Sequence, residues 1–138
     1  MSVRAATVPL HEDEVIEGIR RWVTIESPTY DAAGVEAVLD AVEKDFEGLP
    51  VTFDRREGRD GYGGILKVSA AEPSNEKPIL ILTHIDTVHP KGTLTGRLPF
   101  RRDGDKLYGP GLYDMKGGAY LGVAGYRALV RAGVPTAR

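Results

Sequence analysis

The feature that most constrains the fold of this chain is an unbroken apolar run that leads into two polar residues. The run reads Pro78-Ile-Leu-Ile-Leu-Thr83 and is followed by His84 and Asp86. A strand that is apolar at every position is typical of a strand covered on both faces, as in a parallel sheet between two layers of helices. The run therefore predicts a buried strand and, with it, an α/β protein.

Two stretches before this run carry apolar residues at a period of 3.6, which predicts amphipathic helices. The first extends from about Glu12 to Ile25, and the second covers Val35 to Phe46. Thr29 or Asp31 is available as the N-cap of the second helix. We therefore expect two helices before the apolar run.

A third helix is predicted after Asp114, up to Arg131, because Gly133 and Pro135 follow as stop signals. Each glycine within it lowers its helix propensity by about 1 kcal/mol relative to alanine. These glycines are at positions 117, 118, 122 and 125. We expect these glycines to allow close packing of the helix backbone against the sheet.

Two shorter segments, Val51–Arg56 and Ile65–Ser69, show the alternation of strands. The glycine-rich stretch Gly58–Gly64 lies between them and predicts a hairpin or a loop. The chain of 138 residues is long enough for one globular domain. Helices alternating with a hydrophobic strand predict an α/β sandwich, in which helices pack on a mixed, largely parallel sheet.

Composition narrows the possible partners. The net charge of -2 offers no basic surface for phosphates, so we expect no nucleic acid partner. The longest aliphatic run, Ile79 to Leu82, is far too short to span a membrane, and the first twelve residues hold no signal-peptide core. We expect a soluble, cytoplasmic protein without a membrane partner. Because cysteine is absent, a metal would be held by His, Asp and Glu.

His84 and Asp86 are two residues apart, so in an extended segment their side chains project to the same side. This arrangement suits a carboxylate that orients a metal-bound histidine. It also suits a general-base dyad. The third alternative is an ordinary hydrogen-bonded histidine at a strand end with an aspartate that caps the next turn.

A glycine-rich loop precedes the third predicted helix and contains Asp114. Asp114 stands where a dinucleotide-binding fingerprint needs its third glycine, and Gly117 stands where a phosphate-binding P-loop needs Ser or Thr after Lys116. A nucleotide-binding α/β domain is therefore disfavoured. Asp114 is either the N-cap of the helix or an acidic residue that binds a cation.

Five separated motifs resemble, in order and spacing, the metal-binding half of one zinc exopeptidase family. This is the family of glutamate carboxypeptidase, acetylornithine deacetylase and succinyl-diaminopimelate desuccinylase. Glu26-Ser-Pro-Thr29 also fits the opening of the family. The five motifs are His84-Ile-Asp-Thr-Val88, Lys91-Gly-Thr-Leu94, Pro99-Phe100, Gly104-Asp-Lys-Leu-Tyr-Gly-Pro-Gly111 and Asp114-Met-Lys-Gly-Gly118.

The resemblance implies roles for three residues. His84 would bind one zinc, Asp86 would be the catalytic acidic partner that orients His84, and Asp114 would bridge two zincs, with cobalt or manganese as alternative metals. A cis peptide would follow the bridging aspartate, between Asp114 and Met115. His89 and His11 are expected to have no ligand role.

The resemblance also implies a zinc-dependent hydrolase that cleaves the amide bond of peptides or N-acyl amino acids with a free carboxylate. Pro110 in Gly-Pro-Gly favours the glutamate carboxypeptidase-like branch, because the deacetylase branch usually carries Gly-Arg-Gly there. An acetylornithine deacetylase-like or desuccinylase-like N-deacylase is the alternative.

The general-base glutamate of the family, its remaining ligands and its inserted dimerisation domain have no counterpart in this sequence. Residues 1–138 are therefore expected to form the N-terminal part of the catalytic domain, a truncated zinc-exopeptidase-like, partial three-layer sandwich with little activity alone. The full-length form is expected to be a homodimer. A non-catalytic binding or assembly module on the same half-fold remains a second class of function.

Overall fold

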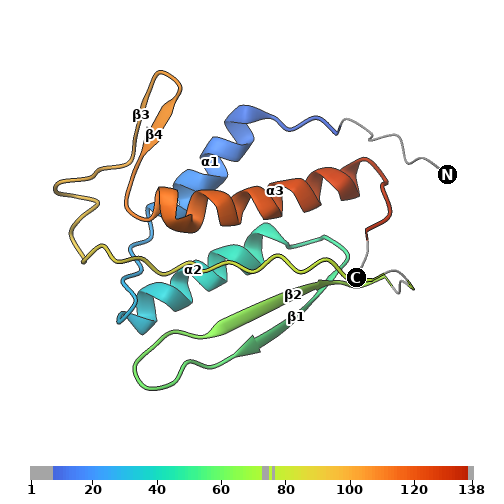
Figure 1. The fold of residues 1–138 in the computed structure, drawn as a ribbon, viewed down its shortest axis with the longest axis horizontal. Coiled ribbons are helices and arrows are strands. Elements are labelled where there is room, and N and C mark those ends of the chain that lie inside the picture. Colours follow the sequence, from blue (N-terminus) through green and yellow to red (C-terminus); the bar gives the residue numbers. More distant parts are fainter. Residues whose placement is uncertain (1–7, 73–74, 76, 137–138) are drawn as a thin grey trace.

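The computed structural model describes residues 8–72, 75 and 77–136 and contains helices, two hairpins and long connecting segments (Figure 1). Among the described residues, no helix is both long and apolar enough to cross a membrane. In chain order the elements are α1 (Glu12–Val23), α2 (Ala32–Asp45), β1 (Val51–Arg56), β2 (Ile65–Ala70), β3 (Arg101–Asp103), β4 (Lys106–Tyr108), the short irregular turn η1 (Leu112–Lys116) and α3 (Gly117–Arg131).

The core lies where the helices meet, and their apolar faces build it. Trp22 of α1 is 1% exposed and meets Tyr120 of α3 edge to face, with ring centroids 5.1 Å apart. The indole Nε1 donates a hydrogen bond to Asp45 Oδ2 at 2.8 Å, so the polar edge of the buried ring has a partner. Val38 of α2 and Val123 of α3 complete the contact between the helices. The predicted amphipathic helices are confirmed, because their apolar stripes are the buried faces.

The two ends of α2 and α3 follow their local sequence. Asp31 occupies the N-cap position of α2, but its side chain makes no cap hydrogen bond and its Oδ2 lies 2.8 Å from Lys91 Nζ instead. After α3, Gly133 has a left-handed φ of 64°, and the amides of Gly133 and Val134 donate to carbonyls in the last turn. These two hydrogen bonds form a Schellman motif, which confirms that the helix ends at the predicted glycine.

The predicted hairpin is confirmed. Strands β1 and β2 pair antiparallel, from Val51 opposite Ala70 to Arg56 opposite Ile65. Arg55 ties the hairpin to α2, since its guanidinium lies within 3.2 Å of three carboxylates on that helix. The hairpin thus has a fixed place beside α2 (Figure 1).

The apolar run Pro78–Thr83 differs from its prediction. It carries no strand, and the side chains of Ile79 and Leu82 are 80% and 83% exposed. A strand forms only where a neighbour accepts and donates backbone hydrogen bonds, and among the described residues the one parallel bridge near this run joins Pro28 to Thr87, just beyond it. The predicted buried strand is therefore wrong for this structure.

The mixed α/β class is confirmed, but the described part of the chain shows only two-stranded antiparallel sheets, β1-β2 and β3-β4. A largely parallel sheet with helices in three layers stays a prediction. The close packing against a sheet that was expected at the glycines of α3 is not found among the described residues, because the two glycines with neighbours face η1 and the run 78–83. A Cβ on Gly117 would lie 2.7 Å from the Leu112 carbonyl, and one on Gly122 would touch Ile81, whereas Gly118 and Gly125 face open space.

Candidate metal centre

The segment that carries His84 and Asp86 is anchored to the connector between α1 and α2. The Thr87 amide donates to the Ser27 carbonyl at 2.8 Å, and the Thr29 amide donates to the Thr87 carbonyl at 3.1 Å. The fully buried Ser27 hydroxyl donates to the Ile85 carbonyl at 2.7 Å. Three hydrogen bonds therefore place His84 and Asp86 beside the end of α1, although no regular strand precedes them.

Asp114 lies in η1, immediately before α3. Gly111 begins this turn with a left-handed φ of 69°, and a Cβ there would overlap the Thr87 side chain. Asp114 itself has non-helical φ and ψ of -126° and 94°, and the Asp114–Met115 peptide is cis, as the resemblance implies. Asp114 is therefore not the N-cap of α3, which removes one of its two interpretations from sequence.

Lys116 fixes η1 to the end of α1. Its side chain is 0% exposed, and its ammonium donates to the carbonyls of Trp22 at 3.1 Å and Ile25 at 2.6 Å. Carbonyls at a helix C-terminus carry partial negative charge and lack helical partners, so they favour a cation. The end of α1 is thus the common support for η1 and for the segment with His84.

These supports bring together residues that are thirty positions apart in sequence. His84 Nε2 lies 3.0 Å from Asp114 Oδ1, and His84 Nδ1 lies 3.2 Å from both Oδ1 and the backbone carbonyl of Asp86. The imidazole therefore stands between two aspartates. This geometry fits a metal-binding histidine whose Nδ1 is oriented by Asp86 and whose Nε2 faces Asp114, and it also fits a general-base dyad.

The donors fit part of a metal site. Two ligands bound tetrahedrally at about 2.0 Å are about 3.3 Å apart, close to the observed separation of His84 Nε2 and Asp114 Oδ1. Imidazole and carboxylate are donors that zinc, cobalt and manganese accept. The residues that the structure describes contain no group of three or more potential ligands, so His84 and Asp114 form a partial ligand set.

The charges around the site shift several pKa values. Partial burial lowers the pKa of His84, but its hydrogen bonds with Asp114 and Asp86 and their negative charges raise it by more. Burial lowers the pKa of Lys116 to about 8, against the opposing charges of Glu26 and Asp86. The amides of Leu94 and Gly92 donate to the Glu26 carboxylate and lower its pKa.

Three residues of this environment were not assigned a role from sequence. The Thr29 hydroxyl donates to Asp86 Oδ2 at 2.6 Å, Glu26 accepts two backbone amides of the loop after His89, and Lys116 bonds α1. Glu26 and Thr29 belong to a motif that matched the family opening, and Thr29 was also a candidate N-cap. Lys116 belongs to the fifth family motif and was otherwise considered only as the lysine of a P-loop. Their partners lie 57 to 94 positions away, which no local pattern indicates.

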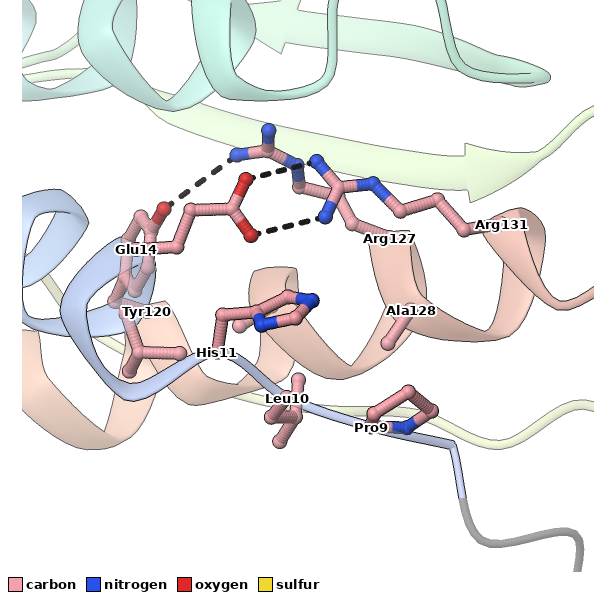
Figure 2. A pocket seen from close by; sticks show the side chains of 10 residues that line it. Pro9, Leu10, His11, Glu14, Tyr120, Arg127, Ala128 and Arg131 are labelled. Carbon is pink, nitrogen blue, oxygen red and sulfur yellow. Dashed lines mark hydrogen bonds and ion pairs between the residues drawn. The ribbon is translucent and has the colours of Figure 1, made fainter.

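The other two histidines lie outside the His84 cluster. His89 lines a small hollow with Glu26, Ser27 and Lys116. His11 precedes α1 and lines a shallow pocket where Arg131 forms two hydrogen bonds with Glu14 (Figure 2). Both arginines that line this pocket are already paired, Arg131 with Glu14 and Arg127 with Asp45 at 3.6 Å.

Comparison with known proteins shows which proteins this chain resembles. Residues 80–138, which include His84, Asp86 and Asp114, match the peptidase family M20/M25/M40. This match agrees with the family that the ordered motifs resemble.

One relative is "Carboxypeptidase G2" of Pseudomonas sp. (strain RS-16), which is 38% identical over 104 residues. These residues are 75% of this chain and 25% of the relative. The similarity supports the glutamate carboxypeptidase-like branch. The chain spans about a quarter of the length of this relative.

Proposed function

We propose that this chain contributes to a metal-dependent carboxypeptidase or amidase that hydrolyses the amide bond of peptides or N-acyl amino acids with a free carboxylate. The observation that carries the proposal is the convergence of His84 Nε2 and Asp114 Oδ1 at 3.0 Å. It occurs in a chain that matches an M20/M25/M40 peptidase and resembles a carboxypeptidase. Residues 1–138 would form the N-terminal part of the catalytic domain.

His84 and Asp114 would hold zinc, with cobalt or manganese as alternatives, and the full-length site would contain two ions. When bound, such a metal polarises the scissile carbonyl and lowers the pKa of a bound water. Asp86, 3.2 Å from Nδ1 of His84, would accept a proton from that nitrogen and so leave the Nε2 lone pair for the metal. The remaining ligands, the general base and the dimer contacts would come from elsewhere in the full-length, homodimeric protein.

Two features favour one substrate class over the other. The similarity to a carboxypeptidase and the Gly109-Pro110-Gly111 sequence both favour a substrate with a C-terminal carboxylate. An N-deacylase acting on acetylornithine-like or succinylated amines is the competing substrate class. A panel of a glutamate-terminated peptide, an N-acyl glutamate, N-acetylornithine and N-succinyl-diaminopimelate separates the two.

The test uses the full-length protein after chelation and after reloading with zinc. We expect hydrolysis of the first two substrates only, and only in the loaded protein. His84→Ala and Asp114→Ala should each reduce kcat/KM by about 10³-fold or more, since a catalytic metal supplies several kcal/mol of transition-state stabilisation. His11→Ala is the matched control and should change kcat/KM less than about twofold, because His11 lies outside the cluster. Hydrolysis that persists in both alanine variants, or that is unaffected by chelation, would refute the proposal.

A further inference from the structure

We propose that Thr29 is a positioning residue of this metal site, whose hydroxyl holds the Asp86 carboxylate in the orientation that faces Nδ1 of His84. The inference deepens the proposed function and rests on it. It starts from an observed chain of contacts. Thr29 Oγ1 donates to Asp86 Oδ2 at 2.6 Å, Asp86 Oδ1 lies 3.2 Å from His84 Nδ1, and His84 Nε2 lies 3.0 Å from Asp114.

The geometry of the carboxylate explains why one hydroxyl matters. The two oxygens of Asp86 have different partners, so Thr29 and His84 together define the plane of the group. The side chain of Asp86 is 32% exposed. Without the bond to Thr29, water would compete for Oδ2 and the carboxylate would rotate more freely about its terminal torsion, which has a broad energy profile.

Thr29 is itself well placed to act as a fixed donor. Its amide donates to the Thr87 carbonyl at 3.1 Å, and its neighbour Pro28 forms the parallel bridge with Thr87. The Thr29 hydroxyl also lies 3.3 Å from the same carbonyl, which is a longer contact than the one with Asp86. The backbone position of Thr29 is therefore set by main-chain bonds that survive the loss of the hydroxyl.

The consequence concerns which nitrogen of His84 carries the proton. A carboxylate fixed at Nδ1 favours the Nδ1–H tautomer, which presents the Nε2 lone pair to a metal. If Asp86 is less well oriented, Asp114 competes for the proton through its 3.0 Å contact with Nε2. The Nε2–H tautomer binds no metal at that atom until the proton leaves.

The expected loss of metal affinity follows from the number of contacts between Thr29 and the metal. Groups that hydrogen-bond a metal ligand typically change metal affinity by 10- to 100-fold, and Thr29 is one bond further away, so we expect about tenfold. The backbone carbonyl of Asp86, also 3.2 Å from His84 Nδ1, remains in the variant and limits the loss.

The variants are made in the full-length protein. Thr29→Val removes the hydroxyl at nearly constant shape, Thr29→Ser keeps it, and Thr29→Ala replaces the valine variant should valine not be accommodated. The matched control is Thr24→Val, because the Thr24 hydroxyl donates to the Arg20 carbonyl at 2.8 Å, at the end of α1. Affinity is measured for Co²⁺ by competition with a chelator.

Thr29→Val should weaken Co²⁺ binding about tenfold, Thr29→Ser should restore it to within about threefold, and Thr24→Val should leave it unchanged. The decisive comparison is made in an Asp86→Ala background. If Thr29 acts through Asp86, Thr29→Val has no further effect there, whereas a general structural role gives independent, additive losses. Additive losses, or unchanged affinity in Thr29→Val, would overturn the inference.

A second readout requires no metal. In the metal-free protein, ¹⁵N-detected NMR of the neutral His84 ring should show that the Nδ1–H tautomer is favoured and that Thr29→Val reduces its share. An unchanged or increased share would contradict the positioning role, since it would mean that Asp86 needs no second contact. If the wild type binds no Co²⁺, the proposed function fails, and the tautomer measurement still decides the role of Thr29.

Discussion

Replacement of Lys116 by methionine tests whether the buried ammonium holds η1 against α1 at a cost to the folded state. Methionine matches most of the lysine stem and removes the charge and three donors. The carbonyls of Trp22 and Ile25 then lose the bonds they accept at 3.1 Å and 2.6 Å. A hydrogen bond to a charged group contributes about 1.5–3 kcal/mol, so the loss of two is about 3–6 kcal/mol.

An opposing term comes from burial of the charge. Burial lowers the pKa of Lys116 from 10.5 to about 8. At about 1.4 kcal/mol for each unit of pKa, the protonated form is about 3 kcal/mol less favourable in the folded state than in water. Methionine relieves this cost, which leaves about 0–3 kcal/mol, and we expect Lys116→Met to destabilise the protein by about 1–2 kcal/mol at pH 7, the middle of this range.

The same pKa shift predicts a pH dependence with a definite sign. Between pH 8 and 10.5 the unfolded chain binds the Lys116 proton more tightly than the folded chain does, so the contribution of Lys116 to stability rises with pH and is lost as pH falls through about 8. The free energy of unfolding of the wild type minus that of Lys116→Met should therefore increase by about 3 kcal/mol across this window.

The assay is urea unfolding of both proteins at pH 7, 8, 9 and 10, followed by circular dichroism. Lys106→Met, at an exposed position in β4, is the matched control and should change stability by less than about 0.5 kcal/mol at pH 7. The reasoning is refuted if Lys116→Met is as stable as the wild type at pH 7 and the two free energies of unfolding also stay equal up to pH 10. Neither the two hydrogen bonds nor the buried charge would then act as described.

Two further predictions concern the supports of the site. Glu26→Gln should destabilise the protein by about 1–2 kcal/mol, because the neutral side-chain amide accepts the hydrogen bonds from the backbone amides of Gly92 and Leu94 less strongly than a carboxylate does. Folding lowers the pKa of Glu26, so its contribution to stability is present above the pKa of the unfolded chain and should vanish as pH falls through the folded pKa. Urea unfolding of both proteins from pH 7 to 3 measures this contribution. A stability difference between wild type and Glu26→Gln that persists at pH 3 would contradict the prediction. Gly111→Ala should cost more than the approximately 1–2 kcal/mol of a left-handed alanine, because its Cβ would also overlap Thr87. Gly48→Ala, with a φ of 76° and open space around it, isolates the backbone cost, and equal losses of thermal stability in the two variants would exclude the overlap.

The local elements were predictable because their causes are local. The apolar stripe that contains Ile19 and Trp22 is the buried face of α1, and the glycine at 133 ends α3 through two backbone bonds. The glycine-rich stretch between β1 and β2 is the turn of a hairpin. In each case neighbouring residues decide the conformation, so a period or a stop signal is sufficient.

The apolar run at 78–83 shows where such prediction stops. Its composition is that of a buried strand, but a strand depends on hydrogen-bonding neighbours and on helices that cover it. Among the described residues no strand pairs with Ile79 to Leu82, and the approach of α3 to Ile81 still leaves these four residues 65–83% exposed. Hydrophobicity therefore predicted a preference for burial, and the available neighbours decided that these side chains stay exposed.

The sequence alone determined the chemistry that the site offers, because His84, Asp86 and Asp114 are the donors that a chain without cysteine can present in its motifs. It could not decide between a metal site, a base dyad and a turn cap. That choice depends on distances between residues far apart in the chain. Only the tertiary structure, through the bonds of Thr29 and Lys116 to partners 57 and 91 positions away, sets His84 between two carboxylates.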